Sequence, residues 1–241
     1  QNGASPFWES LGYKLKEWPN IDDYNLLAKA CQLSLCFIEQ KNEMRYLWEI
    51  YHQGNIPTRT QSWHDFFNNL TWLIYPALKR AIVDKMCQDS TALSSRSSLQ
   101  NTLAHFDECG VVICSSLEQH FELLKNHQWQ QFFCDKNITQ TCLPVIIGHG
   151  LMEKALKPYI GMTAKAVFLK VEPSFFMLPN KMKNDLIDQK MAQFILSEQF
   201  PSTPKLLHPF PLLGWPGWHD AQNEAFYANK QYFREKREIC I

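Results

Sequence analysis

The sequence predicts an α+β fold: a single helix-rich domain with a small mixed sheet and an extended Pro/Trp-rich C-terminal strap. Three observations support this prediction. Apolar residues recur every three or four positions in several segments, as the buried faces of helices require. Two short apolar runs, 111–114 and 163–171, have the composition of strands. Residues 201–218 contain five prolines, two tryptophans and two glycines, which argues against a regular helix or strand there.

The first third of the chain predicts helices and two strands. A helix is expected over 20–33, where acidic residues precede an apolar stripe. Runs rich in aromatic and branched residues predict strands over 33–38 and 46–52, and the glycine, asparagine and proline that follow predict a turn. A long helix is expected from Ser62 until Pro76 breaks it, with a second helix over about 77–86.

The remaining elements follow from turn residues and periodicity. The serine-rich segment 90–98 predicts a mobile loop. A short helix that ends at Phe106 and a turn over 107–110 are expected after it. The later elements expected, in order, are a strand over 111–114, helices over 116–126 and 128–134, a helix over 145–156, a central strand over 163–171 and an amphipathic helix over 181–198.

Length and composition fit one large domain. The chain has 241 residues, of which 45% are apolar and 13% aromatic, enough for a core without disulfides or metal staples. We expect residues 1–19 to form an N-terminal arm, 20–200 the core, and 201–241 an extended segment packing on that core. The 24 basic and 24 acidic residues cancel, which argues against a nucleic-acid partner.

Cysteine usage and hydropathy indicate a compartment. No stretch approaches the roughly 20 apolar residues of a membrane-spanning helix, and no signal-peptide pattern opens the chain. The eight cysteines include no Cys-x-x-Cys pair, and most adjoin apolar residues. We therefore expect a reducing, cytoplasmic location and no membrane partner.

Two groups of polar residues carry most of the chemical information. The signatures of nucleotide-binding loops are absent or incomplete, so no nucleotide cofactor is expected. His64 and Asn68 are four residues apart on one predicted helix face, with Asp65 beside them, and His149 and Glu153 repeat the spacing. A histidine with a carboxylate can act as a general base. His64, Asp65, His149 and Glu153 could also bind a divalent metal.

A structural explanation of the same residues stays open. Asp65 or Ser62 could cap the helix, and each histidine could be a half-buried packing residue with one hydrogen bond. Neither spacing is diagnostic of a site.

Four residues are candidates for substrate contacts. Arg59 could hold an anion or pair with an acid. Asn68 shares the helix face of His64, and Asp107 lies beside Glu108 in a predicted turn where acidic residues are common. Trp218 closes a rigid aromatic turn that could stack on a ligand or pack on the core.

Taken in order, the conspicuous segments resemble a bacterial family known only as domain of unknown function 3025. The matching motifs are Pro57-Thr58-Arg59, His64-Asp-Phe-Phe-Asn68 with Trp72 and Pro76, Phe106-Asp-Glu-x-Gly110, Gly148-His-x-Leu-x-Glu153 with Pro158, and Leu212-Leu-Gly-x-Pro-Gly-Trp218 leading to Asn223, Phe226-Tyr227 and Phe233-Arg234. The resemblance implies a bacterial cytoplasmic protein and supplies no activity. It does place both polar groups within the family's motifs.

Two functions remain. In the first, a hydrolase-like enzyme activates water against a small polar or anionic substrate, with or without a divalent metal. Its cleft would use His64, Asp65, Asn68, His149 and Glu153, with Arg59 and Asp107 at the edge. In the second, a binding or scaffold protein uses the same groups as a buried hydrogen-bond network. The enzyme hypothesis requires the two histidines to meet in an open cavity.

Overall fold

The computed structural model describes residues 18–89 and 96–236. The first half of this part of the chain contains, in order, α2 (Ile21–Ala30), β1 (Cys36–Glu39), α3 (Tyr46–Trp48), the π-helix η1 (Glu49–Gln53), β2 (Asn55–Thr58), α4 (Trp63–Ile74), α5 (Pro76–Gln88) and α6 (Ser98–Cys109). The second half contains β3 (Gly110–Ser115), α7 (Glu118–Lys125), α8 (Trp129–Phe133), α9 (Ile138–Thr141), β4 (Cys142–Ile146), α10 (His149–Lys154), β5 (Thr163–Lys170), η2 (Pro173–Met177), α11 (Asn180–Leu196), η3 (Pro204–Leu206), β6 (His208–Pro211), η4 (Leu212–Gly214) and α12 (Glu224–Tyr227).

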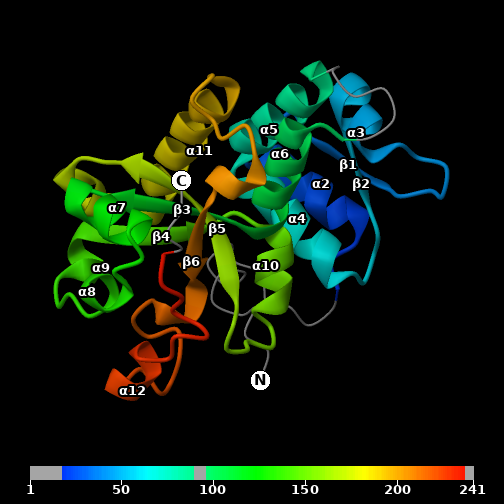
Figure 1. The fold of residues 1–241 in the computed structure, drawn as a ribbon. Coiled ribbons are helices and arrows are strands. Elements are labelled where there is room, and N and C mark those ends of the chain that lie inside the picture. The colour runs from blue at the N-terminus through cyan, green and yellow to red at the C-terminus, as the bar shows by residue number, and fades with distance from the viewer. Residues whose placement is uncertain (1–17, 90–95, 237–241) are drawn as a thin grey trace.

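A four-stranded mixed sheet forms the centre of the fold (Figure 1). Its order is β4-β3-β5-β6, with β3 and β5 parallel and both outer strands antiparallel to their neighbours. Val112 of β3 lies opposite Val145 on one side and Val167 on the other. A second sheet contains only β1 and β2, which are parallel. The α+β prediction is confirmed.

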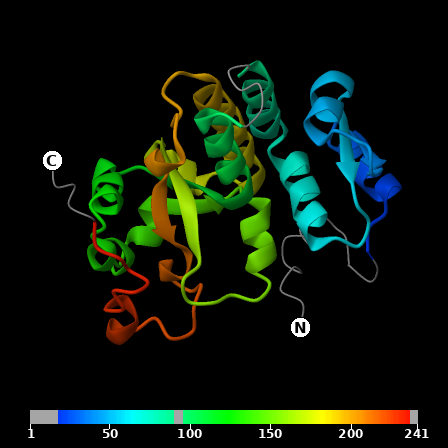
Figure 2. The same cartoon turned by 45° about the vertical axis from the view of Figure 1, so that its right-hand side comes forward.

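Helices cover both faces of the larger sheet. Val112 and Val167 face α5, α6 and α11, whose contributions include Phe106 and Met191. Val111, on the opposite face, packs in a cluster with α7, α8 and the C-terminal segment. A third cluster joins α2 and the two-stranded sheet to α4, and Figure 2 shows this unit beside the body that contains the larger sheet.

The expected strand over 46–52 is wrong, because this segment forms α3 and η1. Large apolar residues alternate with others in this segment, as they would in a half-buried strand. In the structure Ile50 is fully buried, and Tyr46, one helical turn earlier, packs on the same cluster. Gly54 ends η1 in the left-handed region, with φ of 70°, where glycine carries no steric penalty. The expected turn then continues directly into β2.

Three further boundaries differ from expectation. The expected turn over 107–110 is wrong, since α6 continues to Cys109. The helix expected over 145–156 is only partly correct, because residues up to Ile146 belong to β4. The exclusion of a strand from 201–218 is also wrong. His208–Pro211 form β6, an edge strand, and proline is tolerated at an edge because one side of the strand needs no N–H donor.

The remaining helices and strands agree closely with the predictions. Ser62 caps α4, Pro76 begins α5, and β3 and β5 are the two central strands. The N-terminal arm falls almost entirely on residues 1–17, and most of the expected loop on 90–95, which lie outside the described residues. Within the described ranges, no helix has the length and apolar character needed to cross a bilayer, and the seven cysteines are unpaired.

Candidate metal centre

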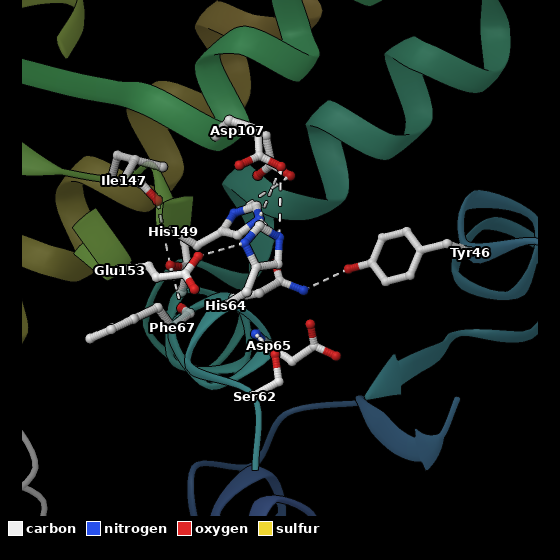
Figure 3. Close-up of polar contacts among 12 residues, drawn as sticks. Tyr46, Ser62, His64, Asp65, Phe67, Asp107, Ile147, His149 and Glu153 are labelled. Atoms are coloured by element: carbon white, nitrogen blue, oxygen red, sulfur yellow. Dashed lines mark hydrogen bonds and ion pairs between the residues drawn. The ribbon is translucent and has the colours of Figure 1, made fainter. Parts of the chain in front are cut away.

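His64 and His149 meet where α4 and α10 cross (Figure 3). The Ser62 hydroxyl accepts the backbone N–H of Asp65 at 3.3 Å, which starts α4 and puts His64 in its first turn. His149 is the first residue of α10. The Nε2 atoms of the two histidines lie 3.1 Å apart. The side chain of His149 is 5% exposed and that of His64 is 32% exposed, so the pair is reached from one side.

Glycines allow α10 to come this close to the end of α6. A Cβ on Gly148 would lie 2.5 Å from the backbone nitrogen of Gly110, and a Cβ on Gly150 would lie 2.3 Å from Oε2 of Glu108. The backbone N–H of Gly148 donates to the carbonyl of Gly110 at 2.9 Å. These glycines therefore bring His149 beside the last turn of α6.

Glu108 of α6 supplies a third donor to the same point. Its Oε1 lies 3.5 Å from Nε2 of His149 and 3.8 Å from Nε2 of His64. Two donors, each about 2.0–2.2 Å from a common ion in tetrahedral or octahedral geometry, are separated by roughly 3.0–3.6 Å. The three observed separations lie within or next to that range.

Carboxylates behind the histidines favour lone pairs on both Nε2 atoms. Nδ1 of His64 lies 3.1 Å from Oε2 of Glu153. Nδ1 of His149 is buried and has no hydrogen-bond partner among the described residues, and it faces Oδ2 of Asp107 at 3.9 Å. A carboxylate hydrogen-bonded to Nδ1 holds the proton on that nitrogen, as Glu153 does for His64. Asp107 makes no hydrogen bond to His149 and favours the same tautomer there through its charge alone. The two Nε2 lone pairs then repel across 3.1 Å, unless a proton or a metal ion lies between them.

Asp65 is held away from the histidines by Arg59. Its Oδ2 accepts the backbone N–H of Arg59 at 2.6 Å and Nε at 3.0 Å, while Oδ1 accepts Nη2 at 2.6 Å. Burial raises the pKa of Asp65, but these contacts outweigh burial and hold that pKa below its usual range. The structure therefore does not bring Asp65 into the donor group.

Asn68 and Asp107 belong to a buried network around Lys79. The Lys79 side chain is 2% exposed; its ammonium donates to Oδ1 of Asn68 at 2.9 Å and forms an ion pair with Asp107. Asn68 in turn donates to the hydroxyl of Tyr46 at 2.7 Å. Burial raises the pKa of Asp107, but Lys79 and His149 outweigh it and lower the net value. Asn68 is thus occupied by structural contacts, and Asp107 links this network to His149.

Charge pairing leaves two carboxylates for a cation. Asp65 is neutralised by Arg59 and Asp107 by Lys79. Within the described residues, Glu108 and Glu153 have only histidine partners within 4.0 Å. The two remaining negative charges match one divalent cation.

The donor group opens into a cavity of about 340 Å³, within the size range of small-molecule sites. Its lining includes His64, Glu108, His149, Arg59 and Arg96. The Arg59 side chain remains 56% exposed despite its contacts with Asp65.

Trp218 lies outside this cavity. It packs against the cluster on the face of the sheet that includes Val111, with its ring 6.4 Å from that of Trp215. The structure does not bring Trp218 to the histidines, because the C-terminal segment closes a different part of the core.

Sequence reasoning did not select Glu108 or Lys79 as site residues. One signal for Glu108 was present: a carboxylate in the last turn of a helix opposes the helix dipole and is unfavourable there without another role. The incorrect turn over 107–110 hid that signal. Lys79 carries no local signal, since its burial depends on packing against α4 and α6.

A second histidine group is structural. Oγ of Ser115 lies 2.8 Å from Nδ1 of His120, whose Nε2 lies 3.7 Å from Asp135. Ser115 is fully buried, and its hydroxyl also contacts the backbone of Leu117 and Thr141. No substrate can reach that hydroxyl.

The comparisons with known proteins identify the family. A family model described as a protein of unknown function, DUF3025, matches residues 35–237. The chain belongs to the DUF3025 family. The match spans every residue of the candidate centre, as the resemblance of the motifs predicts. No curated protein and no solved structure matches the chain.

Proposed function

We propose that this protein is a metal-dependent hydrolase that binds one divalent transition-metal ion through Nε2 of His64, Nε2 of His149 and the carboxylate of Glu108. The observation that carries this proposal is the convergence of the two Nε2 atoms at 3.1 Å while both Nδ1 atoms face carboxylates. Two histidines and one carboxylate are a donor set typical of catalytic zinc sites and of non-haem iron sites.

The outer residues support the same role. Glu153 orients His64, and Asp107, fixed by Lys79, faces Nδ1 of His149. Such carboxylate–histidine–metal arrangements fix the tautomer and raise the basicity of the ligand. The proposed ligand set keeps His64 and His149 from the four candidates of the sequence hypothesis and adds Glu108. Asp65 is not a ligand, and Glu153 lies behind His64 instead of binding the ion.

His64, His149 and Glu108 line the cavity, so an ion that they held would be accessible to water and to a small substrate. A divalent ion held by His64, His149 and Glu108 would supply Lewis-acid chemistry and a water of lowered pKa, which suits hydrolysis of a carboxylic or phosphoric ester. Water adds across the cleaved bond, and no oxidant or reductant is required. Arg59 and Arg96, which line the same cavity, would bind an anionic group of the substrate.

Elemental analysis tests the proposal. Protein purified without a polyhistidine tag is expected to contain about one zinc, manganese or iron ion per chain. His64→Ala, His149→Ala and Glu108→Gln are each expected to lose the ion without a large drop in melting temperature. His105→Ala, which removes an exposed histidine from α6, is the matched control and should retain it.

Metal-loaded protein is then assayed against p-nitrophenyl phosphate and p-nitrophenyl acetate. Metal-dependent turnover that the three ligand variants abolish supports hydrolysis. Wild-type protein that holds no ion after incubation with each metal, together with histidine variants that melt far below wild type, would instead establish a structural network.

A further inference from the structure

A second concave surface lies at the sheet edge formed by β6, away from the histidines. It encloses about 720 Å³, and none of its lining residues lines the cavity of the candidate metal centre. The residues come from the end of α7 and the start of α8, from the segment around β6, and from the end of the described chain, which returns beside them (Figures 1 and 2). We call this surface the β6 groove.

Specific hydrogen bonds hold the walls of the β6 groove together. The carbonyl of Arg234 accepts the indole N–H of Trp129 at 2.7 Å and Nδ1–H of His127 at 3.0 Å. Lys236 donates to the side chain of Asn126 at 3.0 Å. His127 has a left-handed backbone, with φ of 55°, a conformation that non-glycine residues keep only where surrounding contacts impose it.

Positive charge is concentrated in the β6 groove, although the net charge of the whole chain is zero. Four permanent cations line it, and they come from three separate parts of the chain: Lys125, Lys205, Arg234 and Lys236. Among the described residues, the one lining carboxylate is Glu235, which forms an ion pair with Lys230 at 2.6 Å. Lys125 contacts Glu122 at 2.8 Å, outside the lining.

Several donors in the β6 groove are available to a ligand. Among the described residues, Lys205 has no hydrogen-bond or ion-pair partner. Arg234 uses only Nε, which donates to the carbonyl of Gln231 at 3.1 Å. Burial lowers the pKa of His208, and Lys125, His127 and Lys236 lower it further, against a smaller opposite effect of Glu122, as expected for a ring that has more cations than anions around it.

The edge strand β6 is poorly suited to pair with a peptide. Pro209 and Pro211 of β6 line the β6 groove and carry no N–H, so an added strand would lack those donors. The enclosed volume and apolar walls fit a small molecule better than a polymer. Phosphoryl groups, with several oxygens and high charge, match clustered lysine and arginine donors.

We propose that the β6 groove binds a small, multiply charged organic phosphate through Lys205, Arg234 and Lys236. This site is independent of the metal-dependent hydrolase function. Its ligand contacts two parts of the chain, η3 through Lys205 and the C-terminal segment through Arg234 and Lys236, and so would also fasten that segment to the domain.

Calorimetric titration with inorganic pyrophosphate at near-physiological salt tests the proposal. We expect measurable binding by wild type and a loss of roughly tenfold or more in affinity for Lys205→Glu and Arg234→Gln. Lys190→Glu, a matched charge reversal of an exposed lysine on α11, should bind as wild type does. Arg59→Gln should also leave binding unchanged, because Arg59 belongs to the other cavity.

Citrate serves as the carboxylate comparison and should bind more weakly than pyrophosphate. The proposal is overturned if wild type does not bind pyrophosphate, or if citrate binds equally tightly. It is also overturned if Lys190→Glu weakens binding as much as Lys205→Glu, or if Arg59→Gln abolishes it.

Discussion

Gly150→Ala separates metal binding from folding at the candidate centre. The new Cβ would lie 2.3 Å from Oε2 of Glu108, whereas an ordinary carbon–oxygen contact is about 3.3 Å. The carboxylate must therefore move by roughly 1 Å, which is half the length of a metal–oxygen bond of about 2.0–2.2 Å. Glu108 is half-exposed, so its side chain can rotate away. Its backbone carbonyl lies 3.2 Å from the new Cβ, a contact that only a small shift of the α6 end relieves.

The two consequences of this change have opposite signs. Alanine in place of a helical glycine is neutral or stabilising by up to about 1 kcal/mol. Displacing one of three ligands should weaken metal binding by at least about 10- to 100-fold, the loss commonly seen when even an outer partner is removed. Urea denaturation and calorimetric titration with Zn²⁺ measure the two effects on the same preparation.

Two further variants control this experiment. Lys154→Ala changes the exposed face of the same helix and should leave the affinity for Zn²⁺ unchanged. Glu108→Gln keeps the size of the side chain, removes its charge and should reproduce the loss. Wild-type Zn²⁺ affinity in Gly150→Ala would refute Glu108 as a ligand, and a large loss of stability would refute the view that the clash is relieved by rotation.

Three other outcomes follow from the structure. Glu153→Gln should lower metal affinity roughly 10- to 100-fold with little change in melting temperature, because His64 is then less firmly oriented. Unchanged affinity in a Zn²⁺ titration would contradict this role of Glu153. Lys79→Met should lower the free energy of unfolding by about 3–5 kcal/mol in urea denaturation, because it leaves Asp107 charged and unpaired. Adding Asp107→Asn should restore much of this stability. Unchanged stability of Lys79→Met would contradict the pairing. Burial lowers the folded-state pKa of His120, so the unfolded chain binds more protons and stability falls as the pH drops below about 6.5. His120→Gln should show a shallower decline of melting temperature between about pH 7 and pH 5, and an identical decline would contradict the assignment.

Local patterns were sufficient for most of the helices and for the central strands. Ser62 and Pro76 mark helix ends by their own chemistry, as a side-chain acceptor and as a residue without an N–H, so their positions do not depend on distant contacts. The segment 46–52 was predicted as a strand because its large side chains alternate as in a half-buried strand. Its packing against α4 stabilises a helix instead. β6 was missed because proline is excluded from most strands but not from an edge.

Part of the candidate metal centre was also predictable from local sequence patterns. His64, His149 and Glu153 share motifs with histidine–carboxylate spacing, and the structure brings these three together. Asp65 was a candidate ligand because it adjoins His64, yet adjacent helix residues point in different directions, and the Asp65 carboxylate is bound by Arg59. Glu108 depends on how α10 meets α6, an arrangement set by two glycines rather than by any spacing near the histidines.

A crystal of the protein soaked in Zn²⁺, with data collected at the zinc absorption edge, tests the central claim most directly. We expect one anomalous difference peak about 2.0–2.2 Å from Nε2 of His64, Nε2 of His149 and a carboxylate oxygen of Glu108. A cavity without such a peak, in which one imidazole donates a hydrogen bond to the other, would contradict the metal centre and the hydrolytic function that depends on it.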